Sequence, residues 1–366
     1  MRVLLTGARA PATLELARLC ARAGHTVHVA DTYRWHICRG SRHISSAHVL
    51  PAPRGGHDAY VAAVRHLVAA LRIDVIVPTC EEIFHIAARR DALGARVACE
   101  SLSVLGGLHD KWRFTKACDA ADVRRPATWL LPNADALRTL PKGAYIVKPR
   151  YSRFATRVLA WHTGDALPVL NGVDDDGWIA QQCLFGTPLC TWSVSTHGRL
   201  DAHVTYATDV TAGPRGAAIA FHTVQHGGVM TWVRQFLAFH RLSGQFAFDF
   251  IDTGTGLMAI ECNPRSTSGI HCFRDMPDVV RTLLDPLASA PADVREPAPQ
   301  RYFRSRLALL MYGRATCPGA GLLDAADDPW PRRLQWIAWT HLLASSALAG
   351  TDPRRWSTHD IEWNGE

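Results

Sequence analysis

The chain has 366 residues, of which 48% are hydrophobic and 20% charged, and it carries a formal net charge of +7. Such a length allows two or three domains with sizeable cores, and the composition is ordinary for a globular protein. The positive charge comes mostly from scattered arginines, without a run of five or six basic residues. Because such a run is the usual mark of nucleic-acid binding, we expect small-molecule partners and no nucleic acid.

The ten cysteines form no C-x-x-C pair, and most have apolar neighbours in the sequence. This usage is typical of small core residues in a reducing compartment rather than of a disulfide scaffold. Residues 2–7 lack the long apolar core of a signal peptide, and no apolar stretch reaches the length of a membrane span. We therefore expect a cytoplasmic protein with no membrane partner.

Short apolar strands alternate with helical patterns at the start of the chain. Strands are expected at residues 2–5, 24–31 and 74–78, with a helical pattern after the first of them. This alternation predicts a doubly wound parallel sheet, in which ligands bind at the carboxyl ends of the strands. Those ends lie near Gly7, near Asp31 and at residues 79–82.

One interpretation of this region is a nicotinamide cofactor site in an oxidoreductase. Only Gly7 of a G-x-G-x-x-G pattern is present, and the acidic residue that ends the second strand is Asp31. The alternative is a Rossmann-like domain that serves as a scaffold, and so sparse a motif favours this alternative.

The most informative segment is residues 244–265, which read as two strands joined by a Gly-rich turn. The phenylalanines of the first strand share one face and Asp249 lies on the other, because strand side chains alternate. A loop at residues 254–256 sets Asp249 opposite Glu261, and Asn263 follows on the same face.

Two opposed carboxylates are unfavourable unless a cation lies between them. Carboxylate and amide oxygens, completed by phosphate oxygens, are the ligands that Mg²⁺ takes. The same alternation puts Ala259 on the face of Glu261, and Arg265 just beyond is suited to hold an anion. A solvated hairpin with one acidic face is the simpler interpretation, but the apolar neighbours indicate burial, and buried carboxylates need partners.

Two lysines occupy defined positions between these regions. Lys111 lies near the start of a predicted helix at residues 109–118, and Lys148 lies in an apolar strand at residues 144–149, directly before a proline. Residues 178–186 form a further strand that breaks at a glycine. Towards the end of the chain the pattern becomes helical.

Lys111, Lys148, the break at residues 181–186 and the acidic hairpin stand in an order that resembles the ATP-grasp superfamily. The resemblance is closest to stand-alone carboxylate–amine ligases of the carbamoyl-phosphate synthase and biotin carboxylase type, and it covers roughly residues 1–275. It implies an α/β (α+β grasp) fold, with a Rossmann-like N-terminal domain, a two-lobed ATP-grasp fold and a helical C-terminal extension. The implied domains are residues 1–108, 109–182, 183–290 and 291–366.

The resemblance implies an ATP-binding role for one set of residues. Two lysines and a covering loop contact the phosphates, and backbone groups of a hinge hold the adenine. The loop at residues 151–157 lacks the family's usual glycines, and Pro188 stands where many relatives carry a ribose-binding glutamate. The residues that match ATP-binding positions are Lys111, Lys148, Ser152, Arg153, Gln182 and Leu184.

A second set of residues matches the positions that bind the metal ion and face the transferred phosphoryl group. Asp249, Glu261 and Asn263 match the family's Mg²⁺ ligands, with Mn²⁺ as the alternative ion. Arg265 and Lys148 match the catalytic residues that face the transferred phosphoryl group.

The implied reaction is ATP-dependent ligation. A small-molecule carboxylate becomes an acyl phosphate, and an amine displaces phosphate to form an amide, so that ADP and phosphate are released. Two alternatives stay open within the superfamily: an enzyme that phosphorylates or carboxylates its substrate, and an ATP-binding module without catalysis. Relatives are often dimers, so a homodimer is one expected arrangement.

Two features of the second half leave their role open. His222, His226 and His240 show no metal-ligand spacing such as H-x₃-H, although a histidine there could act as an acid or base near neutral pH. The polar residues 266–271 either line an acceptor site or form an ordinary loop.

Overall fold

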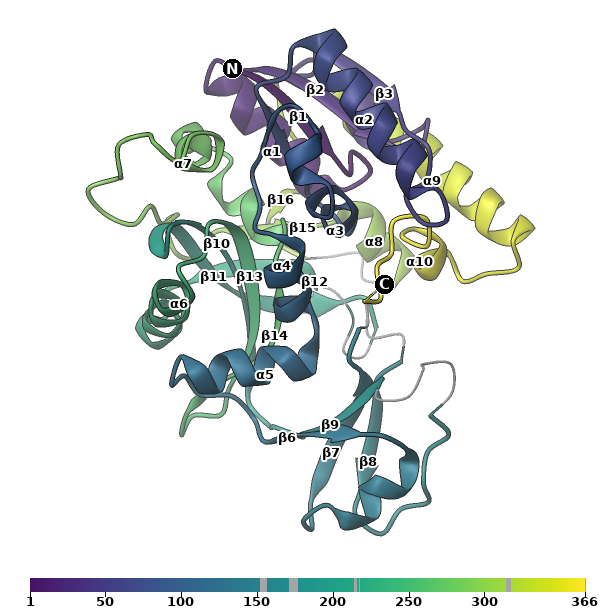
Figure 1. Ribbon diagram of the computed structural model, residues 1–366, viewed down its shortest axis with the longest axis vertical. Coiled ribbons are helices and arrows are strands. Elements are labelled where there is room, and N and C mark those ends of the chain that lie inside the picture. The colour runs from purple at the N-terminus through teal and green to yellow at the C-terminus, as the bar shows by residue number, and fades with distance from the viewer. Residues whose placement is uncertain (152–156, 171–176, 214–215, 217, 314–316, 366) are drawn as a thin grey trace.

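The computed structural model describes residues 1–151, 157–170, 177–213, 216, 218–313 and 317–365. Its strands form three sheets, of five, four and seven strands (Figure 1). The expected mixed α/β architecture is confirmed, and the candidate site lies where segments from all three sheets meet.

The first sheet is parallel and has the strand order β3-β2-β1-β4-β5. The three strands expected from the sequence are its central members. All side chains of β4 are buried, as expected for a strand covered on both faces. The strands are β1 (Arg2–Thr6), β2 (Thr26–Asp31), β3 (Ser46–Val49), β4 (Val75–Val77) and β5 (Arg96–Val97).

Helices cover both faces of this sheet (Figure 1). The first, α1 (Pro11–Arg22), begins with a proline, which suits the first turn because its missing N–H would have no helical partner there. Nine of its twelve residues are buried. The other helices of this region are α2 (His57–Leu71), α3 (Glu82–Ala87), α4 (Leu102–His109) and the short 3-10 helices η1 (Ile37–Gly40) and η2 (Arg90–Ala92).

The second sheet is antiparallel, has the order β6-β9-β7-β8, and extends away from the first sheet at the bottom of Figure 1. It has its own small core around Tyr145, Trp161 and Trp178. The helix α5 (Lys111–Ala120) leads into it. Its elements are β6 (Thr128–Leu131), η3 (Ala134–Thr139), β7 (Ala144–Pro149), β8 (Leu159–His162) and β9 (Trp178–Gln182).

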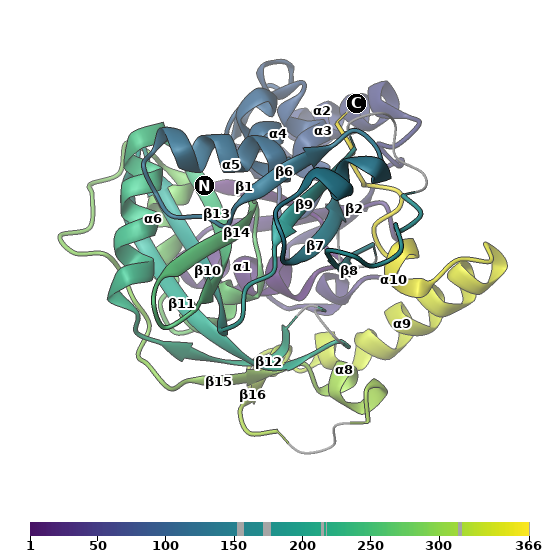
Figure 2. The ribbon, with the colours of Figure 1, turned by 90° about the horizontal axis from the view of Figure 1, so that it is seen from below.

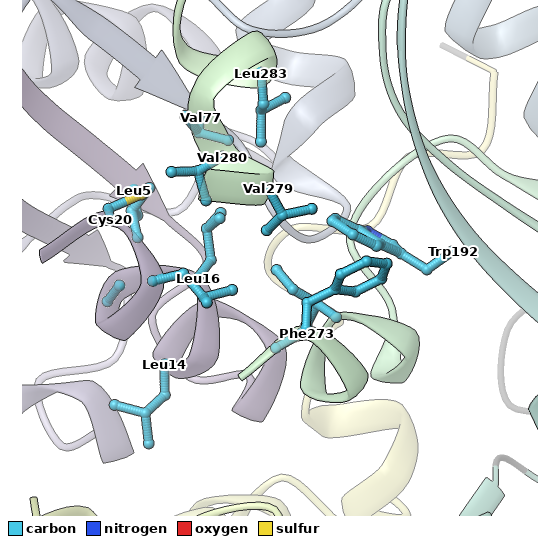
Figure 3. Close-up of a cluster of buried hydrophobic side chains, with 14 of the residues drawn as sticks. Leu5, Leu14, Leu16, Cys20, Val77, Trp192, Phe273, Val279, Val280 and Leu283 are labelled. Atoms are coloured by element: carbon cyan, nitrogen blue, oxygen red, sulfur yellow. The ribbon is translucent and has the colours of Figure 1, made fainter. Parts of the chain in front are cut away.

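The third sheet has the order β14-β13-β10-β11-β12-β15-β16. One face packs on α5 and α6 through the three phenylalanines of β13. The other face packs on the first domain: Trp192 and Phe273 meet Leu16 of α1 in one core (Figure 3). The elements are β10 (Thr187–Thr196), β11 (Arg199–Thr211), β12 (Ala218–Val224), α6 (Gly227–His240), β13 (Gly244–Asp252), β14 (Leu257–Asn263), β15 (Tyr302–Arg304) and β16 (Ala320–Gly321).

The C-terminal part contains the expected helices, together with two short strands. Within this region, whose sequence pattern is helical, residues 302–304 instead form β15, which extends the third sheet. The long helix α9 lies along the outer side of the first domain (Figure 2). The remaining elements are η4 (Ser268–Phe273), η5 (Pro277–Val280), α7 (Arg281–Leu284), α8 (Arg306–Met311), α9 (Trp330–Leu348) and α10 (Pro353–Trp356). Within the described residues, no helix is both long and apolar enough for a bilayer span.

Candidate active site

The acidic hairpin is the pair β13–β14, at the edge of the third sheet. Asp249 lies directly opposite Glu261, as the sequence predicts. The loop is residues 253–256, however, one residue longer than the expected loop at residues 254–256. An extra residue in β14, Ile260, forms a β-bulge that compensates for the longer loop and restores the opposition.

This bulge corrects one prediction about the faces of β14. Ala259 pairs with Phe250 and packs in the core beside Phe248, on the face opposite to the one predicted. A bulge allows one strand to present apolar residues to a core along one half and polar residues to a site along the other.

The two carboxyl groups of the hairpin perturb each other. Burial raises the pKa of Asp249, and the neighbouring Glu261 raises it further. Burial also opposes ionisation of Glu261, but Lys111 and Lys148 outweigh this effect and lower its pKa. Asp249 thus retains its proton to a higher pH than a separate carboxyl group would, because burial and the charge of Glu261 both oppose its ionisation.

Two lysines from different elements approach this pair. Lys111, the first residue of α5, is 4% exposed, and its Nζ lies 3.6 Å from Oε2 of Glu261. Lys148, near the end of β7, is 5% exposed. Burial lowers the pKa of Lys148 to about 8, assisted by Lys111 and opposed by Glu261 and Asp249. Both lysines therefore lie close enough to the hairpin for their charges to act on its carboxyl groups.

Asp110 fixes the position of Lys111. Its carboxylate caps α5 by accepting the backbone N–H of Trp112 at 2.9 Å, and it also accepts a hydrogen bond from Nε of Arg150 at 3.1 Å. The hydroxyl of Tyr151 donates to the same carboxylate at 3.3 Å. Burial alone would raise the pKa of Asp110, but the Arg150 guanidinium and the helix N–H groups hold it below its usual range.

Asp110 is a residue that the sequence reasoning did not single out. Its signal was present, because an aspartate directly before a helix is a preferred N-cap. The neighbours of Asp110 complete a short junction: His109 lies 3.8 Å from Glu81 of the first domain, and the N–H of Lys111 donates to the carbonyl of Arg150. Residues 109–111 thus join the first sheet, the second sheet and the acidic hairpin.

Asn263 and Arg265 continue the hairpin face. The Asn263 amide nitrogen lies 3.5 Å from Asp249, and its oxygen accepts from Arg265 at 3.3 Å. Nε of Arg265 lies 3.6 Å from Glu81, and Nη1 donates to the carbonyl of Ser266 at 3.2 Å. The amide oxygen of Asn263 would have to turn towards the carboxylates before it could ligate a metal.

The expected hinge lies at the end of β9. The N–H of Gln182 donates to the carbonyl of Ala127 at 2.8 Å, and the N–H of Cys183 donates to Ala144 at 2.9 Å. In the described part of the chain, the N–H of Leu184 has no hydrogen-bond partner, so it is available to a ligand. Ser152 and Arg153, expected to cover the phosphates, lie outside the described residues.

The residues present fit a hard divalent cation. Asp249 and Glu261 supply oxygen donors, and burial together with the charge of Glu261 raises the pKa of Asp249. Over the ranges that the structure describes, no group of three or more His, Cys, Asp or Glu gathers as a self-sufficient metal site. Mg²⁺ is commonly held by one or two carboxylates together with substrate phosphates, so a pair of carboxylates with one amide suits it.

The carboxyl edge of the first sheet is filled by the protein's own groups. Asp31 accepts from the N–H of Arg9 at 2.8 Å and pairs with its guanidinium. Glu82 lies against Gly7 and accepts from the Thr6 hydroxyl at 2.7 Å. A carboxylate occupies the place where a dinucleotide fold would bind pyrophosphate, and the acidic residue expected for ribose is already bound, so the nicotinamide interpretation loses its support.

The C-terminal tail completes this edge. Asp360 accepts from Nη1 of Arg9 at 2.8 Å and also binds the Thr32 hydroxyl. Trp363 stacks on Phe84 with ring centroids 4.7 Å apart, and it packs so tightly on Gly106 that a Cβ there would lie 2.8 Å from its ring. The tail then meets Tyr151, the residue that precedes the expected phosphate-covering loop.

The three histidines between hinge and hairpin do not gather. His222 lies 2.8 Å from Asp209, His226 caps α6 through the N–H of Val229, and His240 contacts the carbonyl of Ala117. These local contacts indicate structural roles.

The polar stretch at residues 266–271 is also bound internally at both ends. The Ser266 hydroxyl donates to Gln245 at 2.5 Å, and the buried His271 lies 2.9 Å from Glu15 of α1. Of the two interpretations left open by the sequence, the packed loop agrees better with these contacts.

No family model and no curated protein matches the sequence. The structure, in contrast, is similar to several solved enzymes. An L-amino acid ligase from Bacillus licheniformis is 14% identical with a TM-score of 0.60, over 78% of this chain and 74% of that one. The biotin carboxylase domain of 2-oxoglutarate carboxylase from Hydrogenobacter thermophilus, solved as a dimer with MgADP and bicarbonate, is 13% identical with a TM-score of 0.62, over 82% and 73%.

A phosphoribosylamine–glycine ligase from Thermotoga maritima is 13% identical with a TM-score of 0.62, over 82% of this chain and 78% of that one. At such identities the likeness establishes the fold. The chain therefore has an ATP-grasp fold, preceded by a Rossmann-like domain and followed by a helical extension, as the sequence resemblance implied.

Proposed function

We propose that this protein is an ATP-dependent ligase that activates a small-molecule carboxylate as an acyl phosphate and couples it to an amine. One observation carries the proposal: Asp249 and Glu261 oppose each other beside Lys111 and Lys148, with Arg265 at the end of the same hairpin. Opposed carboxylates next to buried lysines suit a nucleotide whose phosphates and metal neutralise both signs of charge.

ATP would bind between the second and third sheets. Lys111 and Lys148 would hold its phosphates, with Ser152 and Arg153 as further donors. Backbone groups at Gln182 and Leu184 would hold the adenine, a role supported by the available N–H of Leu184.

Asp249, Glu261 and Asn263 would hold Mg²⁺, or Mn²⁺ in its place. The ion would supply neutralisation of the charge on the transferred phosphoryl group. Other solved enzymes with this fold support the assignment, since one contains MgADP.

The chemistry has two balanced steps. A carboxylate oxygen attacks the γ-phosphorus, the bond to the β,γ-bridging oxygen breaks, and ADP leaves. The amine nitrogen then attacks the acyl carbon, the C–O bond breaks, phosphate leaves and the amine loses a proton. Lys148 and Arg265 would stabilise negative charge on the phosphoryl oxygens, and the buried setting would keep water from the acyl phosphate.

Two of the compared enzymes are named for C–N ligation, which favours this reaction over the alternatives. The third compared enzyme has the same fold but is named a carboxylase. A carboxylating or phosphorylating activity is therefore the second candidate. We propose domains at residues 1–108, 109–182, 183–290 and 291–366, a cytoplasmic location, and a homodimer as the form to test first.

The test is release of ADP and phosphate from a panel of carboxylate and amine pairs, with product mass measured in parallel. Amide formation that depends on both substrates supports the ligase. Incorporation of phosphate or bicarbonate into one substrate identifies the alternative. Failure to bind ATP·Mg²⁺, or normal turnover by Glu261→Ala, overturns the proposal.

A further inference from the structure

Glu81 is a buried acid that the proposed chemistry does not use. It lies four residues after the end of β4 and directly before α3, at the carboxyl edge of the first sheet, and is 2% exposed. Its two oxygens lie near basic side chains from other parts of the chain: Oε1 is 3.6 Å from Nε of Arg265, and Oε2 is 3.8 Å from the ring of His109. Burying a carboxylate costs free energy of desolvation, which contacts with its partners must offset. Those partners therefore indicate its role.

The neighbouring acid, Glu82, provides a contrast within the same turn. Glu82 accepts hydrogen bonds from the Thr6 hydroxyl and from the backbone N–H groups of Thr79 and Cys80. These groups all belong to the first domain, and they make Glu82 a support for the turns after β1 and β4. Glu81 instead faces Arg265, which comes from the acidic hairpin.

Arg265 is held on three sides. Nε faces Glu81, Nη1 donates to the carbonyl of Ser266, and Nη2 donates to Asn263. A guanidinium carries five N–H groups, so one N–H on each terminal nitrogen is left for a ligand. The side chain is 23% exposed, which allows those two donors to meet a substrate. Two N–H groups in one plane match the oxygens of a phosphoryl group or a carboxylate.

The other side of Glu81 is also fixed. His109 is 3% exposed, ends α4, and packs on Phe84 with ring centroids 4.9 Å apart. Phe84 is itself stacked on Trp363 of the C-terminal tail. This packing leaves His109, and with it the carboxylate of Glu81, little freedom to move away from Arg265.

We propose that Glu81 is a positioning residue, whose carboxylate orients the Arg265 guanidinium so that its two remaining N–H groups face the transferred phosphoryl group. The inference rests on the proposed function, because it assigns Arg265 to that group. It adds that the first domain, which supplies Glu81, contributes to the chemical step through this ion pair.

The experiment is a double-mutant cycle between Glu81→Gln and Arg265→Ala, after ADP release by the wild-type protein has been established. Glu81→Gln should lower kcat roughly tenfold and leave KM for ATP within about twofold, because the lysines and metal ligands are untouched. In the Arg265→Ala background, Glu81→Gln should cause no further loss, since the group through which it acts is gone.

The control is Glu82→Gln, which removes an equally buried carboxylate that does not face Arg265. Its kcat should stay within about twofold of the wild type. Glu81→Asp, which keeps the charge on a shorter side chain, should recover part of the kcat lost in Glu81→Gln. Thermal unfolding of every variant separates loss of folding from loss of rate, and Glu81→Asp serves in the cycle if Glu81→Gln does not fold.

Two results overturn the inference. One is a fall in kcat of the double variant that equals the product of the two single falls, which would mean that Glu81 does not act through Arg265. The other is a change in KM for ATP with kcat unchanged, which would place Glu81 in nucleotide binding. A wild-type protein that releases no ADP contradicts the proposed function instead, so the two failures are distinguishable.

Discussion

The acidic hairpin and the carboxyl edge of the first sheet both gather carboxylates at the ends of strands, yet their carboxylates have different partners. At the first sheet, Asp31 and Asp360 share the guanidinium of Arg9. In the hairpin, Asp249 and Glu261 face each other, and burial together with Glu261 raises the pKa of Asp249. Carboxylates that share one guanidinium stabilise a fold, whereas two buried carboxylates set directly opposite each other favour the binding of a cation.

The comparison predicts the largest effect for Glu261→Gln. Losing one metal ligand beside Lys111 should lower ATP turnover by about 10²–10³-fold. The melting temperature should change little, because the relieved opposition to Asp249 is offset by the lost attraction to Lys111 and Lys148. ADP release and thermal unfolding measure the two effects.

The matched control lies on the same hairpin. Asp252 is bound to the N–H of Gly254 and to His226, at the end away from Glu261. Asp252→Asn should therefore retain near wild-type turnover. More than about a tenth of wild-type turnover by Glu261→Gln would contradict the distinction between the two regions.

Arg9→Ala should lower stability and leave ATP binding nearly unchanged, in contrast to Glu261→Gln. The change leaves Asp31 and Asp360, which are 0% and 7% exposed, without their shared guanidinium. Removing one partner of a buried ion pair costs about 3–5 kcal/mol of stability. Denaturant unfolding should show this loss, while the affinity for ATP·Mg²⁺ of the folded variant stays within about twofold. A large loss of affinity without a loss of stability would reverse the assignment of the two regions.

The smallest effect concerns pH. Burial lowers the pKa of Lys148 to about 8, so its ammonium is mostly charged at pH 7 and loses its proton as the pH rises through 8. If the Lys148 ammonium binds a phosphate group of ATP, kcat/KM for ATP should fall about tenfold for each pH unit above that pKa. In Lys148→Arg the guanidinium stays charged, so the fall in kcat/KM should begin at a higher pH. A wild-type profile that is flat to pH 9.5 would show that the charge of Lys148 is not needed.

Sequence reasoning found those parts of the site that depend on local patterns. Strand alternation and pairing predicted that Asp249 faces Glu261, and the position of Lys111 at a helix start was correct. The β-bulge at Ile260 was not predicted, because an extra apolar residue in an apolar strand does not change the sequence pattern. The register nevertheless agreed, since the longer loop and the bulge cancel.

The remaining parts depend on contacts between distant segments. Nothing near Glu81 in the sequence indicates that it faces Arg265, because their approach is set by the packing of the first domain on the third sheet. The same holds for Asp31, because nothing in the sequence pairs it with Arg9 or brings Asp360 to the same guanidinium. Such partners decide whether an acid is structural or functional.

The contact between Arg9 and Asp360 also has a consequence for how the protein is made. The two residues are 351 positions apart. A chain emerging from the ribosome exposes β1 and β2 long before residue 360 is synthesised, and domains generally begin to fold in that order. Until the tail arrives, Asp31 is the one charged partner of Arg9 among the residues that the structure describes, and Phe84 lacks its stacked indole. The first domain to emerge is thus the last to be finished.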